Sequence, residues 1–596
     1  MTEIIDLSNP DVLRMLATQD DSSTTESPTS FLSEFSQENG DSDIEMDEEE
    51  FVAVRRRNIP PTIRQPFDIE ELDNNDDGNN GEGWREGTVI PDNLPFVGRT
   101  GLLVDVGGDT PLDFFSMMVD DGMITNLVEE TNRYAGQTLR GKTLSPRSRF
   151  QQWMEVTVGE MRAFLGLIMA MGLIVIENMA EYWSLHDLYR LPFFSSVMVK
   201  DRFLLILSFF HVADNERQAP KEDPGYDPIY KIRTWVEALN RNFGRTFSPG
   251  KNIAIDEAMV AWRGPLSFRV YNPDKPDKFG IKVFELCDSN TAYCCKLDFY
   301  TGKRQSSPRG ATFDVVEGLI APYLDCGRTL YVDNYYTSPI LFTYLKEHGT
   351  LACGTMRMNR QRGPPKEMLP KLKKGDKTVT TLTDGNLNYI RFMDRKEVRI
   401  LTTAHAANSV LTGKTNPVTK EPVIKFAAVH NYNKYMGAVD RSDQMVACNA
   451  FKRRTLKWWK KAFFHLFMLS VLNAYIVHKA TAVKKLSHRI FRRDLAAQLV
   501  QFIFTPVARP LGLGQSSLFR LTARHFPRMI QPKPNAKRQN PQRECVVCSE
   551  RPKRKFSRFE CQDCDVGLHV DRCFELYHTK KDFKRAHKRT FEQSNE

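Results

Sequence analysis

The stretch Asn252-Ile253-Ala254-Ile255-Asp256-Glu257 marks the point where the sequence changes from a helical to a β-like pattern. An apolar, β-branched run is followed directly by carboxylates, which is typical of a buried strand that ends in polar residues. A second run, Thr329–Val332, is followed in the same way by Asp333 and Asn334. The string Val439-Asp440-Arg441-Ser442-Asp443-Gln444 is predicted to be helical, and residues three apart share one helix face. We expect these two strands and this helix to bring their carboxylates to one point.

Converging carboxylates suit two-metal phosphoryl transfer, in which two divalent ions lie roughly 4 Å apart. Magnesium prefers hard oxygen ligands, so Asp256 is expected to bridge the ions and Asp333 to approach from the neighbouring strand. Asp440 and Asp443 would point inward from the helix. Each aspartate alone also has a structural explanation, as a strand end, a turn or a negative charge at a helix N-terminus. Their joint order of strand, strand and helix favours the metal site.

The elements predicted around these strings follow the order of one known fold. Further strands are expected at Lys282–Cys287 and Ala292–Phe299, joined by a hairpin turn at Asp288-Ser289-Asn290. A helix is expected at Pro339–Glu347. A β meander followed by a strand and a helix is the element order of an RNase H-like core. The sequence thus predicts an α+β protein of several domains with a mixed β-sheet and helices at its centre.

Helical patterns flank this core on both sides. Thr157-Val158-Gly159-Glu160 is a capping box that opens a helix to Met171, and Gly172 fits the position after its end. Helices are also predicted at Lys200–Val212 and Tyr230–Phe243, and a long helical stretch is predicted from Gly437 to Thr481. The segment between about residues 358 and 425 is rich in Lys, Arg, Thr and Gly, and resembles an insertion with short strands.

Charge is distributed unevenly along the 596 residues. Residues 1–50 contain fifteen Asp and Glu and one Arg, a net −14, whereas the whole chain carries +9 and the remainder therefore +23. Residues 1–95 are predicted to be disordered. The basic body suggests a polyanion partner such as nucleic acid; charge that only confers solubility is the open alternative. The longest apolar stretches, Ala163–Ile176 and Ala462–Val477, are shorter than the roughly 20 residues that span a bilayer, so no membrane partner is expected.

Five of the eleven cysteines lie near the C-terminus in the pattern Cys545-x2-Cys548-x12-Cys561-x2-Cys564-x4-His569-x3-Cys573-x4-His578. Paired thiolates two residues apart fit a tetrahedral zinc ion, and seven ligands exceed one site, so two structural zinc ions are expected. The other six cysteines are scattered, which favours a reducing compartment over a disulfide framework. A ubiquitin-ligase RING resembles this module superficially, but the nearby Lys and Arg residues favour DNA as its partner.

The strings around the aspartates are long, ordered and specific. They are Ile255-Asp256-Glu257 with Trp262-Arg263-Gly264, Phe268-Arg269-Val270-Tyr271-Asn272-Pro273, Lys278-Phe279-Gly280-Ile281-Lys282, Val332-Asp333-Asn334-Tyr335-Tyr336-Thr337-Ser338, Cys353-Gly354-Thr355-Met356-Arg357, Tyr432-Asn433-Lys434 and Gly437-Ala438-Val439-Asp440-Arg441-Ser442-Asp443-Gln444. Together they resemble the piggyBac transposases over roughly residues 100–480 and again at the C-terminus, but not over the first 95 residues.

The resemblance implies a catalytic triad of Asp256, Asp333 and Asp440, with Asp443 as a fourth acidic residue. It implies two Mg²⁺ ions at the triad, for which Mn²⁺ would substitute. Members of the family cut the ends of their element with water, and the freed 3′-hydroxyl attacks the opposite strand to form a hairpin. The hairpin is reopened and joined to a TTAA target. Because all four positions are Asp here, an active transposase is favoured over a domesticated DNA-binding or chromatin protein.

Two basic segments are candidates for DNA contacts. By resemblance, target DNA faces Asn334, Thr337, Ser338, Arg357, Asn359 and Arg360. Without the resemblance, the arginine-rich part of this segment is simply a solvated basic loop. The second segment interleaves cations with Trp458 and Trp459, so that cations can hold phosphates while at least one indole anchors the helix in the core. Its candidates are Lys452, Arg453, Arg454 and Lys457.

The resemblance also implies the zinc pairing, the partners and the domain plan. In a cross-brace, Cys545, Cys548, His569 and Cys573 share one zinc ion, while Cys561, Cys564 and His578 share the other with His587 or water.

The expected partner is double-stranded DNA (transposon ends and TTAA target). We also expect a homodimer or higher oligomer on DNA, and nuclear localisation. The expected domains are a disordered acidic region 1–95, a mostly helical dimerisation and DNA-binding domain 96–251 and 446–530, an RNase H-like catalytic domain 252–357 and 425–445, an insertion domain 358–424, a linker 531–543 and a cysteine-rich zinc domain 544–596.

Overall fold

Two compact units make up the computed structural model of the protein. The first unit runs up to Arg190 and from Val199 to Ile503, and the second comprises Leu191–Met198 and Phe504–Glu596. The predicted acidic region up to residue 82 lies outside the described residues. Described are residues 83–592 without 146–147, 274, 276, 303–305, 374, 383–385, 394–395, 416–419, 449, 452, 454, 502–524, 533–539, 550–553, 562–563, 565 and 581.

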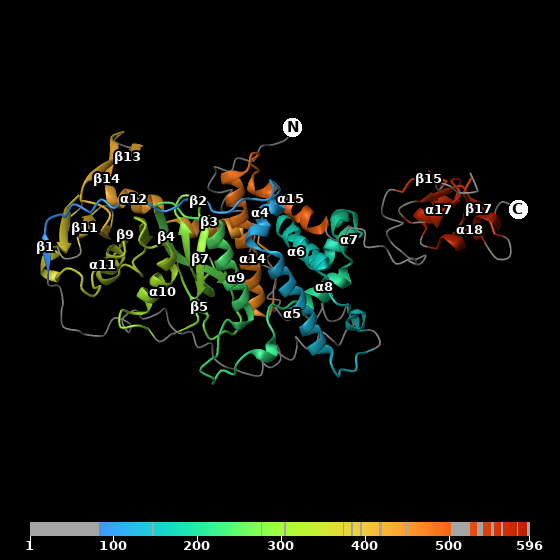
Figure 1. Ribbon diagram of the computed structural model, residues 1–596, viewed down its shortest axis with the longest axis horizontal. Helices are drawn as coiled ribbons and strands as arrows, with labels where there is room; N and C mark the ends of the chain where they lie inside the picture. The colour runs from blue at the N-terminus through green and yellow to red at the C-terminus, as the bar shows by residue number, and fades with distance from the viewer. Residues whose placement is uncertain are drawn as a thin grey trace, which may run out of the picture. The chain divides into compact units, whose positions relative to one another are not determined.

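A ten-stranded mixed sheet forms one part of the first unit, beside a group of helices that includes α14, Trp458–Thr481 (Figure 1). Its strands are β1 (Trp84–Glu86), β4 (Asn252–Ala261), β5 (Val270–Tyr271), β6 (Phe279–Asp288), β7 (Cys294–Phe299), β8 (Thr329–Val332), β9 (Leu351–Thr355), β10 (Lys377–Leu382), β11 (Leu387–Met393) and β12 (Glu397–Thr402). Their order is β1-β10-β11-β12-β9-β8-β4-β6-β5, and β7 also pairs with β6. β8 runs parallel to β4 and β9, whereas β4, β6 and β7 form an antiparallel meander. The predicted RNase H-like core is thus confirmed.

The predicted insertion extends this sheet and forms no separate core. β12 pairs antiparallel with β9, and β11 and β10 follow in order, so the strands of the insertion continue the central sheet of β4, β6, β8 and β9. Within the described part of the segment, the hairpin of β13 (Ser409–Thr415) and β14 (Pro422–Phe426) stands apart as a two-stranded sheet. A basic composition alone could not show this continuity, because strand partners are set by the fold.

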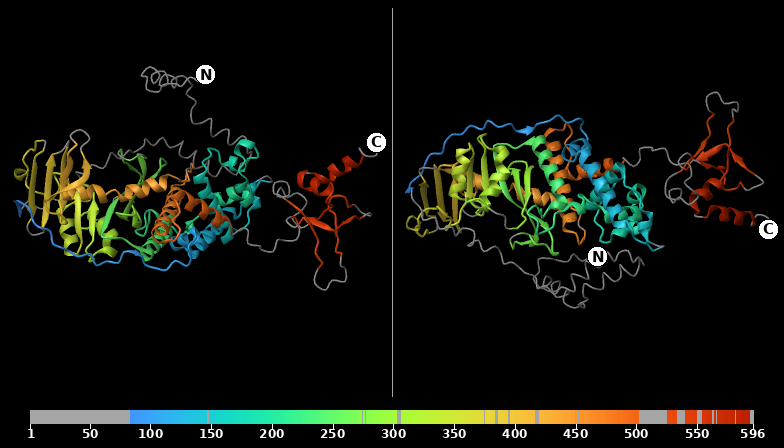
Figure 2. Two further views of the ribbon diagram at one scale, coloured as in Figure 1. Left: turned by 90° about the horizontal axis from the view of Figure 1, so that it is seen from above. Right: turned by 60° about the horizontal axis from the view of Figure 1, so that its bottom comes forward.

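An N-terminal strap runs along the sheet, although residues 83–95 are predicted to be disordered. Trp84 is 6% exposed, and its indole Nε1 donates to the carbonyl oxygen of Arg362 at 3.0 Å. Farther along the strap, the Arg328 guanidinium lies 5.3 Å from the ring centre of Phe96. The blue segment in Figures 1 and 2 follows this path from β1 towards α4. The prediction is wrong here because a few buried anchors fix a polar segment that has no periodic pattern.

The longest described helix of the first unit, α14, contacts α4, α9, α13 and α15. The other helices of this unit are α4 (Pro111–Met118), α5 (Asp121–Leu139), α6 (Val158–Leu173), α8 (Lys200–Phe209), α9 (Tyr230–Thr246), α10 (Ala311–Ile320), α11 (Pro339–Glu347), α12 (Ala427–Tyr435), α13 (Ala438–Ala447) and α15 (His488–Gln501). Thr157 and Glu160 form the predicted capping box of α6. Gly172 lies inside the last turn of α6, and the predicted helix from Gly437 to Thr481 is divided into α13 and α14.

Among the described residues, α14 is the one helix long and apolar enough to cross a membrane. Within this fold, 89% of its apolar window is buried. The Phe463 ring centre lies 4.8 Å from that of Trp235 and 4.7 Å from that of Phe210. Trp459, at the start of α14, is 2% exposed. α14 is therefore a core helix, as the sequence predicts, and Trp459 is the tryptophan that anchors it.

Gly354 on β9 offers a test of the packing beneath the end of β8. A Cβ atom there would lie 2.1 Å from Oγ1 of Thr337 and 2.7 Å from the carbonyl oxygen of Val332. We expect Gly354→Ala to destabilise the first unit by about 1–3 kcal/mol because this space is already filled. Gly318 in α10 is the control, since a Cβ there meets nothing within 4 Å and Gly318→Ala should stabilise by about 0.5–1 kcal/mol. Calorimetric unfolding measures both; equal effects would contradict the packing.

The second unit is small and consists mostly of the C-terminal part of the chain, together with the short segment Leu191–Met198. Its strands are β15 (Pro527–Met529), β16 (Arg543–Glu544), β17 (Phe556–Ser557), β18 (Phe559–Cys561) and β19 (Val566–Gly567), and its helices are α7 (Pro192–Val197), α17 (Cys573–Thr579) and α18 (Phe583–Glu592). β15 pairs with β18, so the module begins before the predicted boundary at residue 544.

Two short strands of the first unit, β2 (Gly101–Leu102) and β3 (Phe247–Ser248), pair with each other.

Candidate metal sites and nucleic-acid contacts

Three carboxylates meet where the pairing of β8 with β4 ends. The parallel register runs to Ile255 and Val332, so Asp256 and Asp333 are the next residues on neighbouring strands. One carboxylate oxygen from each of Asp256, Glu257 and Asp333 lies within 4.8 Å of the other two. The sequence suggests that a strand ends just before Asp256. In the structure, however, β4 continues past Asp256 and stays paired with β6. The feature that ends at Asp256 is the contact with β8.

Fixed hydrogen bonds orient these carboxylates. Oδ1 of Asp333 accepts from the backbone N–H of Tyr335 at 2.9 Å. The Thr337 hydroxyl donates to the carbonyl oxygen of Asp333 at 2.8 Å. Lys282 Nζ donates to Oε1 of Glu257 at 2.7 Å and lies 4.5 Å from the ring centre of Tyr335. The turn after β8 and one lysine therefore hold Asp333 and Glu257 in place.

The carboxylates disturb one another's ionisation. Burial, followed by repulsion from Glu257, raises the pKa of Asp333 to about 6. The same two causes raise the pKa of Asp256 well above its ordinary value. Burial also opposes the ionisation of Glu257, but attraction to Lys282 and hydrogen bonds with Asp256 and Lys282 together lower the pKa of Glu257. A divalent cation would relieve this repulsion, and hard oxygen donors suit Mg²⁺, so these residues fit the predicted ions.

Asp440 and Asp443 lie on α13, which packs against β4. Neither belongs to the compact group of three carboxylates. Oδ1 of Asp440 accepts from Lys275 Nζ at 2.8 Å, and the same Nζ donates to the carbonyl oxygen of Glu257 at 2.9 Å. The charge of Asp443 also acts on Lys275. The carboxylates of Asp256 and Asp333 therefore lie close together. Asp440 is linked to β4 through the hydrogen bonds of Lys275.

Glu257 is the acidic residue to which the sequence analysis assigned no role. It is 8% exposed and forms part of the carboxylate group. Adjacent strand residues normally point to opposite faces, which argues against using both Asp256 and Glu257 at one site. One feature of the sequence could have indicated a role for Glu257. It is the pair of adjacent acidic residues after an apolar run, together with Lys282 in the next expected strand, which can keep one of the two acids ionised.

A polar surface lies next to this group, at the turn after β8. Asn334 and Asn359 are exposed. Arg357 Nε donates to Oδ1 of Asn334 at 3.2 Å, and Arg360 donates to the carbonyl oxygen of Asn334 at 2.8 Å. The arginines thus brace Asn334 and leave a cationic surface beside the carboxylates.

Two other predicted DNA-contact residues have structural roles in this fold. Thr337 is fully buried, and its hydroxyl supports the carbonyl of Asp333, so its side chain is not on the surface. Ser338 is the N-cap of α11, and its hydroxyl accepts from the backbone N–H of Leu341 at 3.2 Å. The predicted contact of Thr337 with DNA is corrected accordingly: Thr337 holds the turn that presents Asp333.

The second basic segment is described in part. Lys452 and Arg454 lie outside the described residues. Arg453 donates to the backbone carbonyl of Glu177 at 2.7 Å, and Lys457 lies 5.7 Å from an aromatic ring centre in α5. These contacts attach the segment to the helical part of the first unit. Its role in DNA binding stays a prediction.

The C-terminal unit contains two groups of four metal-binding side chains, and within each group one ligand atom per residue lies within 4.8 Å of the others. The first group is the predicted set of Cys545, Cys548, His569 and Cys573. Cys548 Sγ lies 3.3 Å from Nδ1 of His569, and Nε2 of His569 lies 3.1 Å from the carbonyl oxygen of Phe556. The hydrogen bond with Cys573 lowers the pKa of the Cys545 thiol, which favours a thiolate there.

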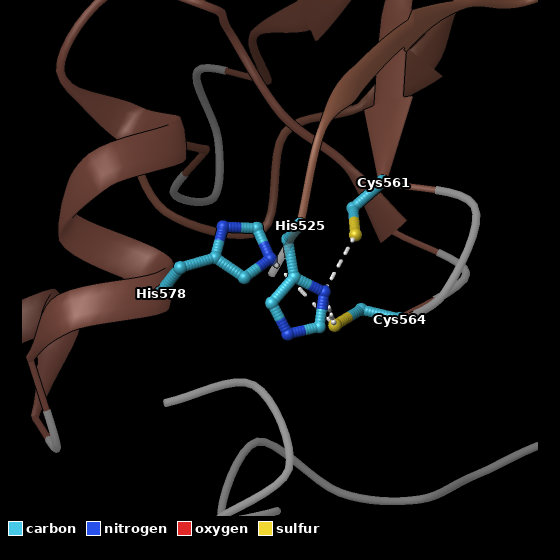
Figure 3. A group of neighbouring side chains, drawn as sticks. All are labelled: His525, Cys561, Cys564 and His578. Atoms are coloured by element: carbon cyan, nitrogen blue, oxygen red, sulfur yellow. Dashed lines mark hydrogen bonds between the residues drawn. The ribbon is translucent and has the colours of Figure 1, made fainter. Parts of the chain in front are cut away.

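The second group consists of His525, Cys561, Cys564 and His578 (Figure 3). Nδ1 of His525 lies 3.4 Å from Cys561 Sγ and 3.6 Å from Cys564 Sγ, while Nε2 of His578 lies 3.6 Å from Cys564 Sγ. Zn–S bonds of about 2.3 Å and Zn–N bonds of about 2.0 Å at tetrahedral angles give S···N distances of about 3.5 Å. Both groups therefore fit zinc.

The eighth ligand differs from the prediction of His587 or water. His525 takes that place, and His587 lies on α18 outside the group. His525 stands twenty residues before Cys545 and outside the repeated Cys-x2-Cys spacing, so the motif gave no reason to include it. β15 begins two residues after His525 and pairs with β18, which brings His525 beside Cys561.

The fold and these sites define the class of the protein. Residues 110–475 match a family model described as "Transposase IS4", and residues 531–579 match one described as "DDE_Tnp_1-like zinc finger". The chain thus has a transposase domain of the RNase H-like type followed by a zinc finger. It belongs to the piggyBac family of transposases.

Known relatives agree with this assignment. "PiggyBac transposable element-derived protein 3" from Homo sapiens is 26% identical over 486 residues, which are 79% of this chain and 76% of the relative. "PiggyBac transposable element-derived protein 5" from Homo sapiens is 24% identical, over 66% of this chain and 78% of the relative. A piggyBac transposase, solved by cryo-electron microscopy as a synaptic complex with hairpin DNA, shares the fold. Its TM-score is 0.59 at 21% identity, and the match covers 79% of this chain and 99% of that one.

Proposed function

We propose that this protein is a cut-and-paste DNA transposase. It would bind the terminal inverted repeats of its element, excise the element through hairpinned ends and insert it at TTAA targets. The observation that carries the proposal is the meeting of Asp256, Glu257 and Asp333 at the end of β8, with Asp440 on the adjacent helix. The solved relative of similar fold was captured with hairpin DNA, which supports DNA ends as the substrate.

The residues of the site have distinct tasks in this proposal. Asp256, Asp333 and Asp440 hold two Mg²⁺ ions, for which Mn²⁺ substitutes. When bound, such ions activate the attacking oxygen and stabilise the leaving oxygen of a phosphodiester. Lys282 keeps Glu257 ionised, and the backbone N–H of Tyr335 orients Asp333. The surface around Asn334 would position the phosphates of the target strand.

The second unit is proposed to recognise the transposon ends. Its two structural zinc ions would hold a small module together, and Lys584 and Arg585 on α18 are exposed for contacts with phosphates. Excision requires two ends to be cut together, so we propose a homodimer or higher oligomer on DNA. Because the substrate is chromosomal DNA, we propose that the protein acts in the nucleus.

A second candidate function is DNA binding without transposition. The human relatives are named as proteins derived from a transposable element, which fits a retained fold with a different use. The carboxylates favour the enzyme, because a protein that only binds DNA does not need three acidic groups that repel one another. The two functions differ in one observable, strand cleavage that depends on a divalent metal.

A plasmid excision assay tests the proposal. The plasmid carries the inverted repeats that flank the gene, each bordered by TTAA, and purified full-length protein is added with Mg²⁺. We expect hairpinned element ends, and donor ends that a DNA ligase added afterwards joins at a single TTAA. Binding to the repeats without any strand cleavage, in Mg²⁺ and in Mn²⁺, would reject the transposase and support the second candidate.

A further inference from the structure

Lys275 occupies the space between α13 and the β4–β8 carboxylates. Its Nζ donates to Oδ1 of Asp440 at 2.8 Å and to the carbonyl oxygen of Glu257 at 2.9 Å. The negative charges of Asp256 and Asp443 attract the same ammonium group. One monovalent cation therefore contacts or attracts all of the predicted catalytic aspartates except Asp333.

The position of Lys275 is built by the β5–β6 hairpin. β5 pairs with the start of β6, and the backbone N–H of Asn272 donates to the carbonyl oxygen of Lys278 at 2.8 Å, which closes the loop. The Lys275 side chain is 17% exposed, whereas that of Asp440 is 52% exposed. The ammonium group thus lies on the inner side of Asp440, towards β4.

We propose that Lys275 is an exchangeable counter-cation of the metal site, which competes with the divalent ion for Asp440 and, once displaced, binds a DNA phosphate there. This inference rests on the proposed function. A ligand oxygen of Asp440 that is paired with an ammonium group has to exchange that partner before it binds a metal ion. Lys275 contacts both the backbone of Glu257 and the carboxylate of Asp440, so its displaced Nζ would stay within reach of a DNA phosphate at the site.

Lys275 would therefore have opposite effects on two properties: it would weaken the binding of a divalent ion and strengthen the binding of a DNA phosphate. Without DNA, Lys275 neutralises part of the carboxylate charge and weakens metal binding. With DNA, the released ammonium group adds a contact to a phosphate oxygen. Partly exposed ion pairs contribute little each, so we expect loss of Lys275 to lower the half-saturating Mn²⁺ concentration by about threefold to tenfold.

The test uses full-length Lys275→Met and measures Mn²⁺ binding by electron paramagnetic resonance without DNA, followed by end cleavage at saturating Mn²⁺. We expect tighter Mn²⁺ binding together with cleavage slowed by about tenfold or more. Lys278→Met is the matched control, because Lys278 is exposed in the same loop and the variant loses the same charge. Lys275→Arg keeps the charge and should restore the unchanged protein's half-saturating concentration.

Each outcome decides a separate point. If Lys275→Met and Lys278→Met both bind Mn²⁺ as the unchanged protein does, the competition is wrong and the proposed function stands. If Mn²⁺ binding tightens while cleavage stays at full rate, the phosphate contact is wrong. Asp256→Asn and Asp333→Asn should each remove Mn²⁺ binding that the unchanged protein shows. If the unchanged protein does not bind Mn²⁺, or if neither variant weakens the binding, the proposed metal site is wrong and this inference is wrong with it.

Discussion

Asp333→Asn is expected to reduce the rate of DNA end cleavage by a factor on the order of 10³ or more. Asparagine keeps the size of the side chain and can still accept the hydrogen bond from Tyr335, but it lacks the charge that a divalent ion requires. Loss of about 4 kcal/mol of transition-state stabilisation corresponds to this factor. The rate is measured in the plasmid excision assay at equal protein concentration, and binding to the repeats is measured in parallel and should be unchanged.

Asp201→Asn is the matched control for this substitution. Asp201 lies on α8, its side chain is half exposed, and its contact with Arg149 is a loose ion pair at 3.8 Å. We expect cleavage within about twofold of the unchanged protein, because exposed ion pairs contribute little. Normal excision by Asp333→Asn would contradict the assignment of the carboxylate group.

His525→Ala is expected to remove one of two zinc ions from the protein. A structural zinc ion contributes on the order of 10 kcal/mol to the folding of a small module, so loss of a ligand should loosen the second unit. We expect one zinc equivalent per chain instead of two by mass spectrometry of the metal, and at least about tenfold weaker binding to the repeats. The proposed cleavage site lies in the first unit, so cleavage should persist at high DNA concentration.

His587→Ala distinguishes the two candidate ligand sets. His587 lies on α18 outside both groups of four, so this variant should retain two zinc ions. One zinc ion in His587→Ala together with two in His525→Ala would contradict the structure and restore the ligand predicted from the sequence. Loss of zinc in neither variant would show that three ligands suffice at this site.

The core was predictable from sequence where local pattern and tertiary pairing agree. The runs at β8 and α11 were expected at the observed residues, and the capping box of α6 fixed its start. Long-range pairing was not predictable. The strap around Trp84 depends on partners more than 200 residues away. The continuation of the sheet by β10–β12 depends on the pairing of β12 with β9 across the basic segment that separates them in the sequence. Neither feature has a local periodic signal.

In the candidate site too, some residues could be predicted from local sequence pattern and others could not. Asp256 and Asp333 were expected to meet because each follows an apolar run, and the parallel register of β4 and β8 places them side by side. Glu257 was missed because strand alternation argues against it, and His525 because it lies outside the cysteine spacing. Thr337 was assigned to DNA through the family resemblance of its string, whereas here its hydroxyl holds the Asp333 turn.

Iron-directed backbone cleavage tests most directly whether the carboxylates of β4, β8 and α13 form one divalent-metal site. Fe²⁺ replaces Mg²⁺, and ascorbate with peroxide then generates radicals that cut the polypeptide close to the bound ion. We predict cuts near Asp256, Asp333 and Asp440 that excess Mg²⁺ suppresses and that Asp333→Asn removes. Cuts at none of these three positions, in protein that still excises DNA in Mg²⁺, would contradict the account.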